Sequence, residues 1–218
     1  RDFIRESATD GRPFCLSISF KAPHKPHDVI DPADQSRYEG ATFSTRRNWG
    51  RQAAALLASQ ARLGRQYHLF QDWDEQRYNE HIRAYYRLIS GIDKVVGSLR
   101  EELRRAGTAD NTVVVYTSDN GYYCGSHGLG GKVLAHEESS RVPLIVMDPR
   151  RSTGRSDSSA ARPPALSSAI VGTVDLAPTI LDLTGIGPVG DADGESLAPL
   201  LYGDSLRVRE SLPLISNW

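Results

Sequence analysis

A short apolar run that ends in polar turn residues constrains the fold of this chain more than any other stretch. Residues 112–117 are β-branched and apolar with no polar alternation. This pattern is typical of a strand buried on both faces, in a sheet with helices on both sides. Ser118, Asp119, Asn120 and Gly121 follow, and these are turn residues. The pattern predicts a carboxylate and an amide just past the end of a buried strand, where ligands bind in open α/β sheets.

The side chains around this turn suit a site for a metal ion and an anion. Asp119 and Asn120 offer hard oxygen ligands, which suit Ca²⁺ or Mg²⁺ better than a soft metal. Glycines crowd residues 121–131, so the backbone can turn tightly and approach a ligand closely. His127 and Lys132 supply groups that can face an anion. Taken alone, a strand followed by Asp-Asn-Gly is also an ordinary surface turn.

Two further apolar runs predict strands, and one long run predicts a helix. The strands are Phe14–Phe20, which lies between prolines, and Pro143–Met147. Between Arg77 and Ala106 apolar side chains recur at helical spacing, arginines gather near the C-terminal end, and Gly107 follows as a stop. We expect this stripe to be core packing and not a cofactor site. The chain is thus predicted to be an α/β domain in which 14–20, 112–118 and 143–147 share one sheet flanked by helices.

Three shorter signals complete the outline. Asp175 is expected to be the N-cap of a helix that Gly185 ends. The alanine-rich stretch Arg51–Leu63 predicts a short helix. Residues 150–164 are rich in Ser, Arg, Ala and Pro, which predicts a mobile surface loop.

Length and charge narrow the class of protein. A chain of 218 residues can form one domain with a substantial core. Its net charge of −1 gives no general attraction to nucleic acid or to an anionic membrane. No apolar run approaches the ~20 residues that span a bilayer. Cys15 and Cys124 have no metal or redox spacing; Cys15 is expected to be buried, and a disulfide between the two stays open.

Several separate elements then agree with one family. Ser-Asp-Asn-Gly121, Gly-x-His-Gly-Leu-x-x-Lys132, Glu137 and Ser-Arg-Val-Pro-Leu-Ile-Val resemble, in order and spacing, the sulfatases of the alkaline-phosphatase superfamily. The resemblance extends from about Phe14 to about Asp204. It implies an alkaline-phosphatase-like α/β fold, with a mixed sheet sandwiched between helices. It also implies hydrolysis of sulfate esters with a divalent cation, Ca²⁺ or alternatively Mg²⁺.

The resemblance assigns roles to five residues. Asp119 and Asn120 would be metal ligands, and Lys132 would contact the sulfate. His24, which lies in an Ala-Pro-His-x-Pro context, would contact the sulfate or the leaving oxygen. His127 would lie on the substrate side. The cation and the cationic side chains would stabilise charge on the sulfuryl oxygens in the transition state, and the substrate would be a sulfated small molecule or glycan.

The sequence departs from the family pattern at two positions and in its nucleophile. Many relatives carry an acidic residue at Ser126 and tyrosine at His136, which bears on substrate preference. The family uses a formylglycine made from the Cys or Ser of a Cys/Ser-x-Pro/Ala-x-Arg motif. Neither cysteine opens that motif, and Ser211-Leu-Pro-Leu-Ile lacks the arginine. The paired N-terminal aspartates of the family metal site also have no counterpart, so we expect no residue of this chain to be the nucleophile.

These departures lead to an expectation for the chain as a whole. Residues 1–218 should be a single partial catalytic domain, the second part of a sulfatase, with the formylglycine in a missing segment. Such a piece should be inactive alone and should expose apolar surface that favours self-association. The family resemblance also implies an exported protein.

Two other classes of function stay open. One is a phosphate or phosphonate ester hydrolase of the same superfamily. A Thr or an unmodified Ser as nucleophile would favour this class. The other is a non-catalytic module that uses the fold to bind anions or glycans.

Overall fold

The computed structural model describes residues 1–152, 166–187 and 190–214. They form two compact units, one of residues 1–110 with 120–141 and one of residues 111–119 with 142–218. The predicted loop at 150–164 falls mostly outside the described residues; its first residues belong to the 3-10 helix η5 (Pro149–Ser152).

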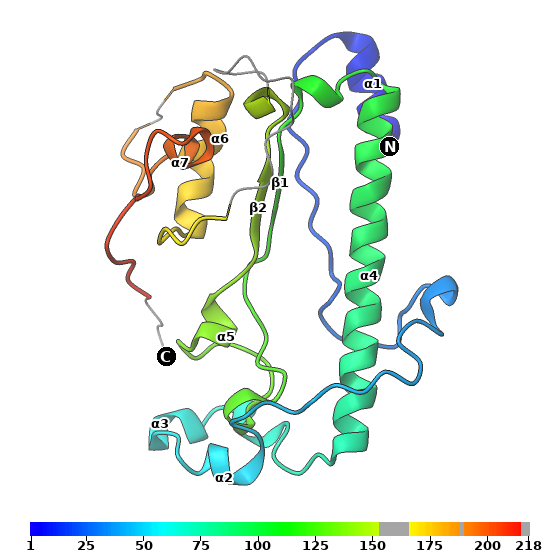
Figure 1. Cartoon of the computed structure of the whole chain (residues 1–218), viewed down its shortest axis with the longest axis vertical. Helices are drawn as coiled ribbons and strands as arrows, with labels where there is room; N and C mark the ends of the chain where they lie inside the picture. The colour runs from blue at the N-terminus through cyan, green and yellow to red at the C-terminus, as the bar shows by residue number, and fades with distance from the viewer. Residues whose placement is uncertain (153–165, 188–189, 215–218) are drawn as a thin grey trace. The chain divides into compact units, whose positions relative to one another are not determined.

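A 31-residue helix, α4 (Glu75–Arg105), dominates the first unit (Figure 1). It begins at the N-cap Asp74, whose carboxylate accepts a hydrogen bond from the Arg77 amide at 2.8 Å. Gly107 follows the helix with φ +69°, a left-handed conformation that glycine adopts without steric cost. The predicted helix is confirmed; of its apolar stripe, Ile82, Ile92 and Leu103 are buried, while Tyr86 is 37% exposed.

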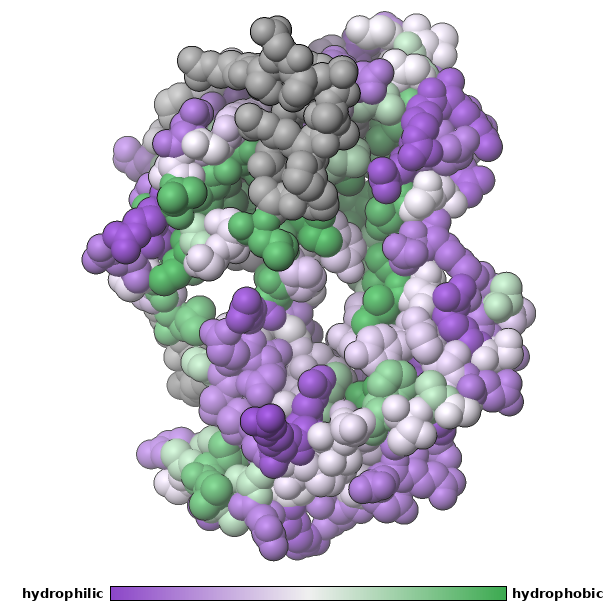
Figure 2. Space-filling view, in the orientation of Figure 1, coloured by the Kyte–Doolittle hydropathy of each residue, from purple (hydrophilic) through white to green (hydrophobic). Residues whose placement is uncertain are grey.

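Shorter helices complete the first unit. They are α1 (Asp2–Asp10), η1 (Pro32–Asp34), α2 (Gly50–Ala54), α3 (Ser59–Arg62), η2 (Arg65–His68), η4 (Ser126–Gly128) and α5 (Glu137–Ser140), and η3 (Ala109–Asn111) lies at the boundary with the second unit. Two helices, α2 and α3, thus replace the single helix predicted for 51–63. Helices of this length are not stable in isolation and depend on packing, here through the buried Ala54 and Leu57. Leu56 and Leu63 point outward and are 88% and 86% exposed. In Figure 2 the surface of this segment is apolar.

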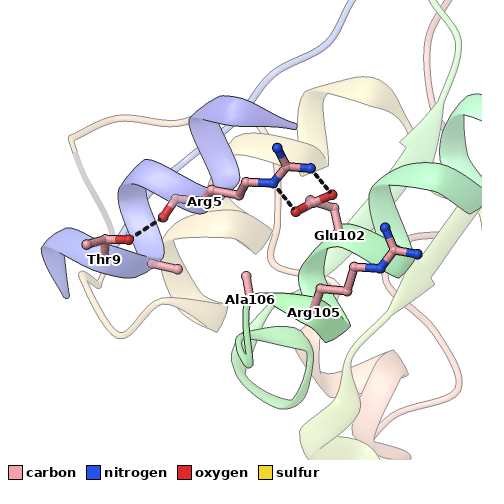
Figure 3. A pocket seen from close by; sticks show the side chains of 6 residues that line it. Arg5, Thr9, Glu102, Arg105 and Ala106 are labelled. Atoms are coloured by element: carbon pink, nitrogen blue, oxygen red, sulfur yellow. Dashed lines mark hydrogen bonds and ion pairs between the residues drawn. The ribbon is translucent and has the colours of Figure 1, made fainter.

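Helix α1 is held against the C-terminal end of α4 by a buried carboxylate (Figure 3). Glu102 accepts hydrogen bonds from Arg5 Nε at 2.6 Å and from Nη2 at 2.9 Å. The shallow pocket beside this pair is lined also by Thr9, Arg105 and Ala106. Because Arg5 and Glu102 neutralise each other, we interpret this pocket as part of the contact between α1 and α4 and not as a candidate site.

The segment Phe14–Phe20, predicted as a buried strand, is not one. It has no ladder partner among the described residues, and Leu16 and Ile18 remain 40% and 43% exposed. A strand needs a neighbour that pairs with its backbone N–H and C=O groups, and apolar composition cannot supply one. Cys15, expected to be buried, is an exposed free thiol, while Cys124 is a buried free thiol, so the two are not linked.

The second unit contains a two-stranded antiparallel sheet. Strand β1 (Val114–Thr117) pairs with β2 (Leu144–Met147), with Val114 opposite Met147 and Thr117 opposite Leu144. Both predicted strands are therefore confirmed, in one sheet. They are only partly buried, and Ile145 is 60% exposed, because a two-stranded ribbon cannot cover both of its own faces.

The rest of the second unit is organised by one buried carboxylate. Its helices are η6 (Thr173–Asp175), α6 (Leu176–Leu183) and α7 (Ala198–Tyr202). Asp175 is the N-cap residue of α6, as predicted, but its carboxylate does not cap that helix. It accepts hydrogen bonds from the amides of Gly172 at 2.8 Å and Glu195 at 2.9 Å, and pairs through both oxygens with Arg209. Asp175 thereby ties three segments together; Gly185 ends α6 with φ +73°.

Candidate functional site

The loop that carries most of the predicted site residues has a firmly held backbone. The Tyr123 amide donates to the Gly131 carbonyl at 2.9 Å, and the Gly125 amide donates to the Leu129 carbonyl at 3.1 Å. Tyr123 and Leu129 are fully buried. Backbone hydrogen bonds across the loop and buried side chains beneath it make this loop a rigid support for its exposed side chains.

The glycines of this loop are needed for contacts within the protein. A Cβ on Gly128 would lie 2.5 Å from the Gly50 carbonyl oxygen, and a Cβ on Gly130 would lie 2.5 Å from the Leu69 Cβ. A Cβ on Gly125 would overlap the Trp49 ring. The sequence predicted that these glycines let the backbone approach a ligand closely. In the structure, the atoms close to them belong to other residues of the chain.

His24 lies in an exposed turn. Its Nδ1 is 2.8 Å from the Lys25 carbonyl oxygen. Because a carbonyl only accepts, Nδ1 carries the proton, and Nε2 is the nitrogen left for a ligand. The His24 side chain is therefore oriented before any substrate binds.

Contacts of His27 join the turn of His24 to the loop that begins at Asn120. The His27 ring lies 4.6 Å from the His81 ring and 6.5 Å from the Tyr122 ring, centroid to centroid. Burial lowers the pKa of His27; a backbone hydrogen bond to Pro23 opposes this effect, and Lys25 adds to it. His27 is therefore part of an aromatic cluster with His81 and Tyr122.

His81, at the centre of that cluster, was not singled out from the sequence. It projects from α4 between Phe70 and Trp73, whose rings lie 5.2 and 5.1 Å away. Burial lowers the pKa of His81 to about 4, so the ring is neutral at pH 7. Its Nε2 lies 3.1 Å from the Tyr122 hydroxyl, and burial raises the pKa of Tyr122, so the phenol keeps its proton. The only signal in the sequence was its place one residue before the stripe residue Ile82.

The predicted metal ligands follow β1. Asp119 is exposed, with one carboxylate oxygen 3.4 Å from the Ser118 hydroxyl. The side-chain amide nitrogen of Asn120, Nδ2, donates a hydrogen bond to the Gly121 carbonyl at 2.9 Å. Consecutive in sequence, the two belong to different compact units. The described residues contain no group of three His, Cys, Asp or Glu that could hold a metal, and two side chains are only part of the 6–8 oxygens that Ca²⁺ takes.

His127 and Lys132 lie on the same loop as Asn120, and both are partly buried. His127 Nε2 lies 3.4 Å from Glu138 Oε1, and the His127 ring stacks on the His136 ring with centroids 4.5 Å apart and planes 16° from parallel. His136 Nδ1 is in turn 2.8 Å from the Tyr123 hydroxyl. Burial, and then proximity to His127, lowers the pKa of His136. The sequence pointed to His127, but not to the partners that hold it.

One serine motif contradicts the expectation that no residue of the chain opens a formylglycine motif. Ser158-Ser-Ala-Ala-Arg162 has the letters of the motif. It lies outside the described residues.

Comparison with known sequences gives one family. The sequence model of the family "Sulfatase" matches residues 1–186. The N-acetylglucosamine-6-O-sulfatase of Bacteroides thetaiotaomicron is 38% identical over 128 residues, covering 59% of this chain and 21% of that protein. The extracellular sulfatase SULF-1 homolog of Drosophila melanogaster is 31% identical, covering 97% of this chain and 18% of that protein. The choline-sulfatase of Rhizobium meliloti is also 31% identical, covering 88% and 36%.

Solved structures give the same answer for the fold. The structure of BT4656 in complex with its substrate D-glucosamine-2-N,6-O-disulfate is similar, with a TM-score of 0.67 and 25% identity, covering 95% of this chain and 53% of that one. The phosphonate monoester hydrolase of Agrobacterium radiobacter has a TM-score of 0.74 and 24% identity, covering 93% and 41%. These neighbours confirm the predicted α/β fold of the alkaline-phosphatase type.

The chain is much shorter than the relatives it matches. The chain spans between 18% and 36% of the length of the three curated relatives. Among the described residues, no helix is long and apolar enough to cross a membrane. Since the family model matches residues 1–186 of 218 and the curated relatives agree with it, the chain belongs to the sulfatase family.

Proposed function

We propose that these residues form part of the active site of a sulfuric ester hydrolase that acts on a sulfated small molecule or glycan. The observation that carries the proposal is the rigid loop 120–132, which presents Asn120, His127 and Lys132 and is joined to the turn of His24 through His27 and Tyr122. The relatives named above as sulfatases support the same reaction class. We further propose that the protein is exported, as the family resemblance implies.

In this proposal each polar side chain has one task. Asp119 and Asn120 supply oxygen ligands to a divalent cation, Ca²⁺ in the first place, and that cation would stabilise charge on the sulfuryl oxygens. Lys132 brings a second positive charge to the same oxygens. His24, held through Nδ1, offers Nε2 to the sulfate or to the leaving oxygen. The expected nucleophile is a formylglycine, and neither cysteine of this chain lies in the motif from which it is made.

The test is the substitution of Lys132 by alanine in the full-length protein that contains these residues. Loss of this positive charge should lower turnover of an aryl sulfate about 10²-fold. Lys21→Ala, at an exposed position, is the matched control and should leave the rate unchanged. An undiminished rate in Lys132→Ala would remove Lys132 from the site.

Phosphonate ester hydrolysis is the second candidate. The phosphonate monoester hydrolase of Silicibacter pomeroyi is 28% identical over the aligned part and covers 62% of this chain, with a TM-score of 0.51. The same assay with a phosphonate monoester decides between the two, because a sulfatase should turn over the aryl sulfate much faster.

A further inference from the structure

We propose that Glu138 is a positioning residue that fixes the ring of His127 in one orientation and one tautomer, so that Nδ1 of His127 faces the substrate. This rests on the proposed function, because it assigns a task to a residue of the same site. It concerns a contact between side chains eleven positions apart, which the motif itself does not reveal.

The backbone of His127 points to a functional constraint. Its φ is +58° and its ψ is +17°, a left-handed conformation that is uncommon for residues with a Cβ. The surrounding loop enforces it, since the Gly128 amide donates to the carbonyls of Asn48 at 3.2 Å and Gly125 at 3.0 Å. Strained residues of this kind persist where the surroundings over-determine them, often at functional sites.

The ring of His127 contacts Glu138 and His136. Glu138 Oε1 lies 3.4 Å from Nε2, and the ring of His136 stacks on one face at 4.5 Å. The side chains of His127 and Glu138 each remain 32% exposed. A carboxylate accepts but does not donate, so it favours the tautomer with the proton on Nε2 and leaves Nδ1 as the nitrogen for a ligand.

Glu138 is itself firmly placed. Burial alone would raise its pKa, but its backbone hydrogen bond, the nearby His127 and hydrogen bonds from Ser126 and His127 outweigh burial and lower that pKa. The carboxylate is therefore ionised at neutral pH and suited to accept from an imidazole.

Helix α5, which carries Glu138, is bonded to the backbone beside both ends of the site loop. The Ser139 carbonyl accepts from the Gly121 amide at 2.8 Å, next to Asn120. The Ser139 hydroxyl accepts from the Val133 amide at 2.8 Å, next to Lys132. A Cβ on Gly121 would overlap the Glu138 carbonyl. Glu138 thus reaches His127 from a helix that is fixed to the neighbours of Asn120 and Lys132.

The first experiment measures the tautomer of His127 directly, with no need for activity. In the ¹⁵N-labelled chain, the ¹⁵N shifts of the His127 ring, measured at alkaline pH where the ring is neutral, should show the Nε2–H tautomer. Glu138→Gln should shift His127 toward a mixture of tautomers, because the amide can accept or donate. Glu137→Gln is the matched control, since Glu137 is its neighbour on α5, 76% exposed and paired only loosely with Arg141 at 3.5 Å. An unchanged tautomer in Glu138→Gln overturns the inference.

A second variant covers the case in which Glu138→Gln does not fold. His136→Tyr removes the stacked imidazole but keeps Glu138, so His127 should retain the Nε2–H tautomer. A change of tautomer in this variant would assign the orientation to His136 and overturn the role of Glu138.

The third experiment asks whether the orientation matters for turnover in the full-length protein. Glu138→Gln should lower kcat/KM about tenfold and Glu137→Gln should not. If Glu138 acts through His127, the double variant with His127→Ala should lose no more than His127→Ala alone. Additive losses, or equal losses in both glutamate variants, contradict the inference. Absence of sulfatase activity in the unaltered protein would instead overturn the proposed function, and the tautomer measurement would still decide the inference.

Discussion

Gly128 and Gly91 differ in whether the structure around them has room for a side chain. Gly128 has φ +68° and sits against α2, where a Cβ would lie 2.5 Å from the Gly50 carbonyl and 2.8 Å from the Ala54 Cβ. Gly91 lies inside α4, where a Cβ would meet nothing within 4 Å. One glycine is required by packing and the other only weakens a helix.

We expect Gly128→Ala to lower the free energy of unfolding by about 1–3 kcal/mol, because it overpacks the contact with α2 and strains the backbone. Gly91→Ala should raise it by about 0.5–1 kcal/mol through helix propensity. Urea unfolding of both variants measures the difference. Equal effects would mean that the loop does not pack on α2 as described.

His81 should make stability depend on pH in a mildly acidic range. Its pKa is lowered to about 4 in the folded chain, by burial first and then by His27 and Lys25, against about 6.5 when unfolded. The unfolded chain therefore binds the proton more readily, so this part of the stability is complete above about pH 6.5 and is lost as pH falls towards 4. We expect His81→Asn to reduce the slope of unfolding free energy against pH between these values. His68→Asn, at an exposed position, should leave that slope unchanged, and a His81 variant with an unaltered slope would contradict the assignment.

At the scale of elements, α4 illustrates how a local signal sets a boundary. Asp74 accepts from the Arg77 amide and satisfies one of the unpaired donors at the helix start. Along the helix, Arg83 donates to the Ala41 carbonyl at 2.9 Å and Lys94 pairs with the buried Asp34 at 2.6 Å. The helix is therefore also the support on which the irregular segment 31–43 is fixed.

Asp74→Ala should lower the free energy of unfolding by about 1 kcal/mol through loss of the cap. Asp93→Ala, at an exposed position inside the same helix, replaces the same side chain without touching a cap. It should be neutral or slightly stabilising, because alanine has the better helix propensity. Chemical denaturation of the two variants compares them, and equal destabilisation would argue against a capping role for Asp74.

At the scale of the whole molecule, we expect the 218-residue chain alone to hydrolyse aryl sulfates negligibly and to bind Ca²⁺ weakly. Asp119 and Asn120 are too few ligands for this ion, and neither cysteine lies in a formylglycine motif. Turnover of an aryl sulfate with added Ca²⁺, together with calorimetric titration of the ion, should be compared with the full-length protein. Turnover by the chain equal to that of the full-length protein would place the nucleophile within these residues, and Ser158→Ala would then show whether it is Ser158.

The apolar side chains at the surface lead to an expectation for the same sample. Leu56 and Leu63 are 88% and 86% exposed, and Leu16 and Ile18 are 40% and 43% exposed. Exposed apolar side chains favour association where they gather into patches. Sedimentation at increasing concentration should show self-association of the 218-residue chain, and a monomer at all concentrations would contradict it.

The sequence by itself determined the features that depend on neighbours along the chain. The period of apolar residues and Gly107 after the last turn predict α4, and short apolar, largely β-branched runs predict β1 and β2. The order of the motifs indicated the family. The strand-end position predicted Asp119 and Asn120 as metal ligands, and this stays a prediction. These signals are local because helix hydrogen bonds, caps and turns join residues only a few positions apart.

Only the tertiary structure decided what depends on a distant partner. The run 14–20 has the composition of a strand, but pairing needs another strand, and none pairs with it in the described part of the chain. Tyr122 meets His81 across 41 positions, and Glu138 meets His127 only because α5 docks beside Gly121. Such contacts leave no period in the sequence, since they are set by how separate elements pack and by which polar atoms that packing leaves to be satisfied.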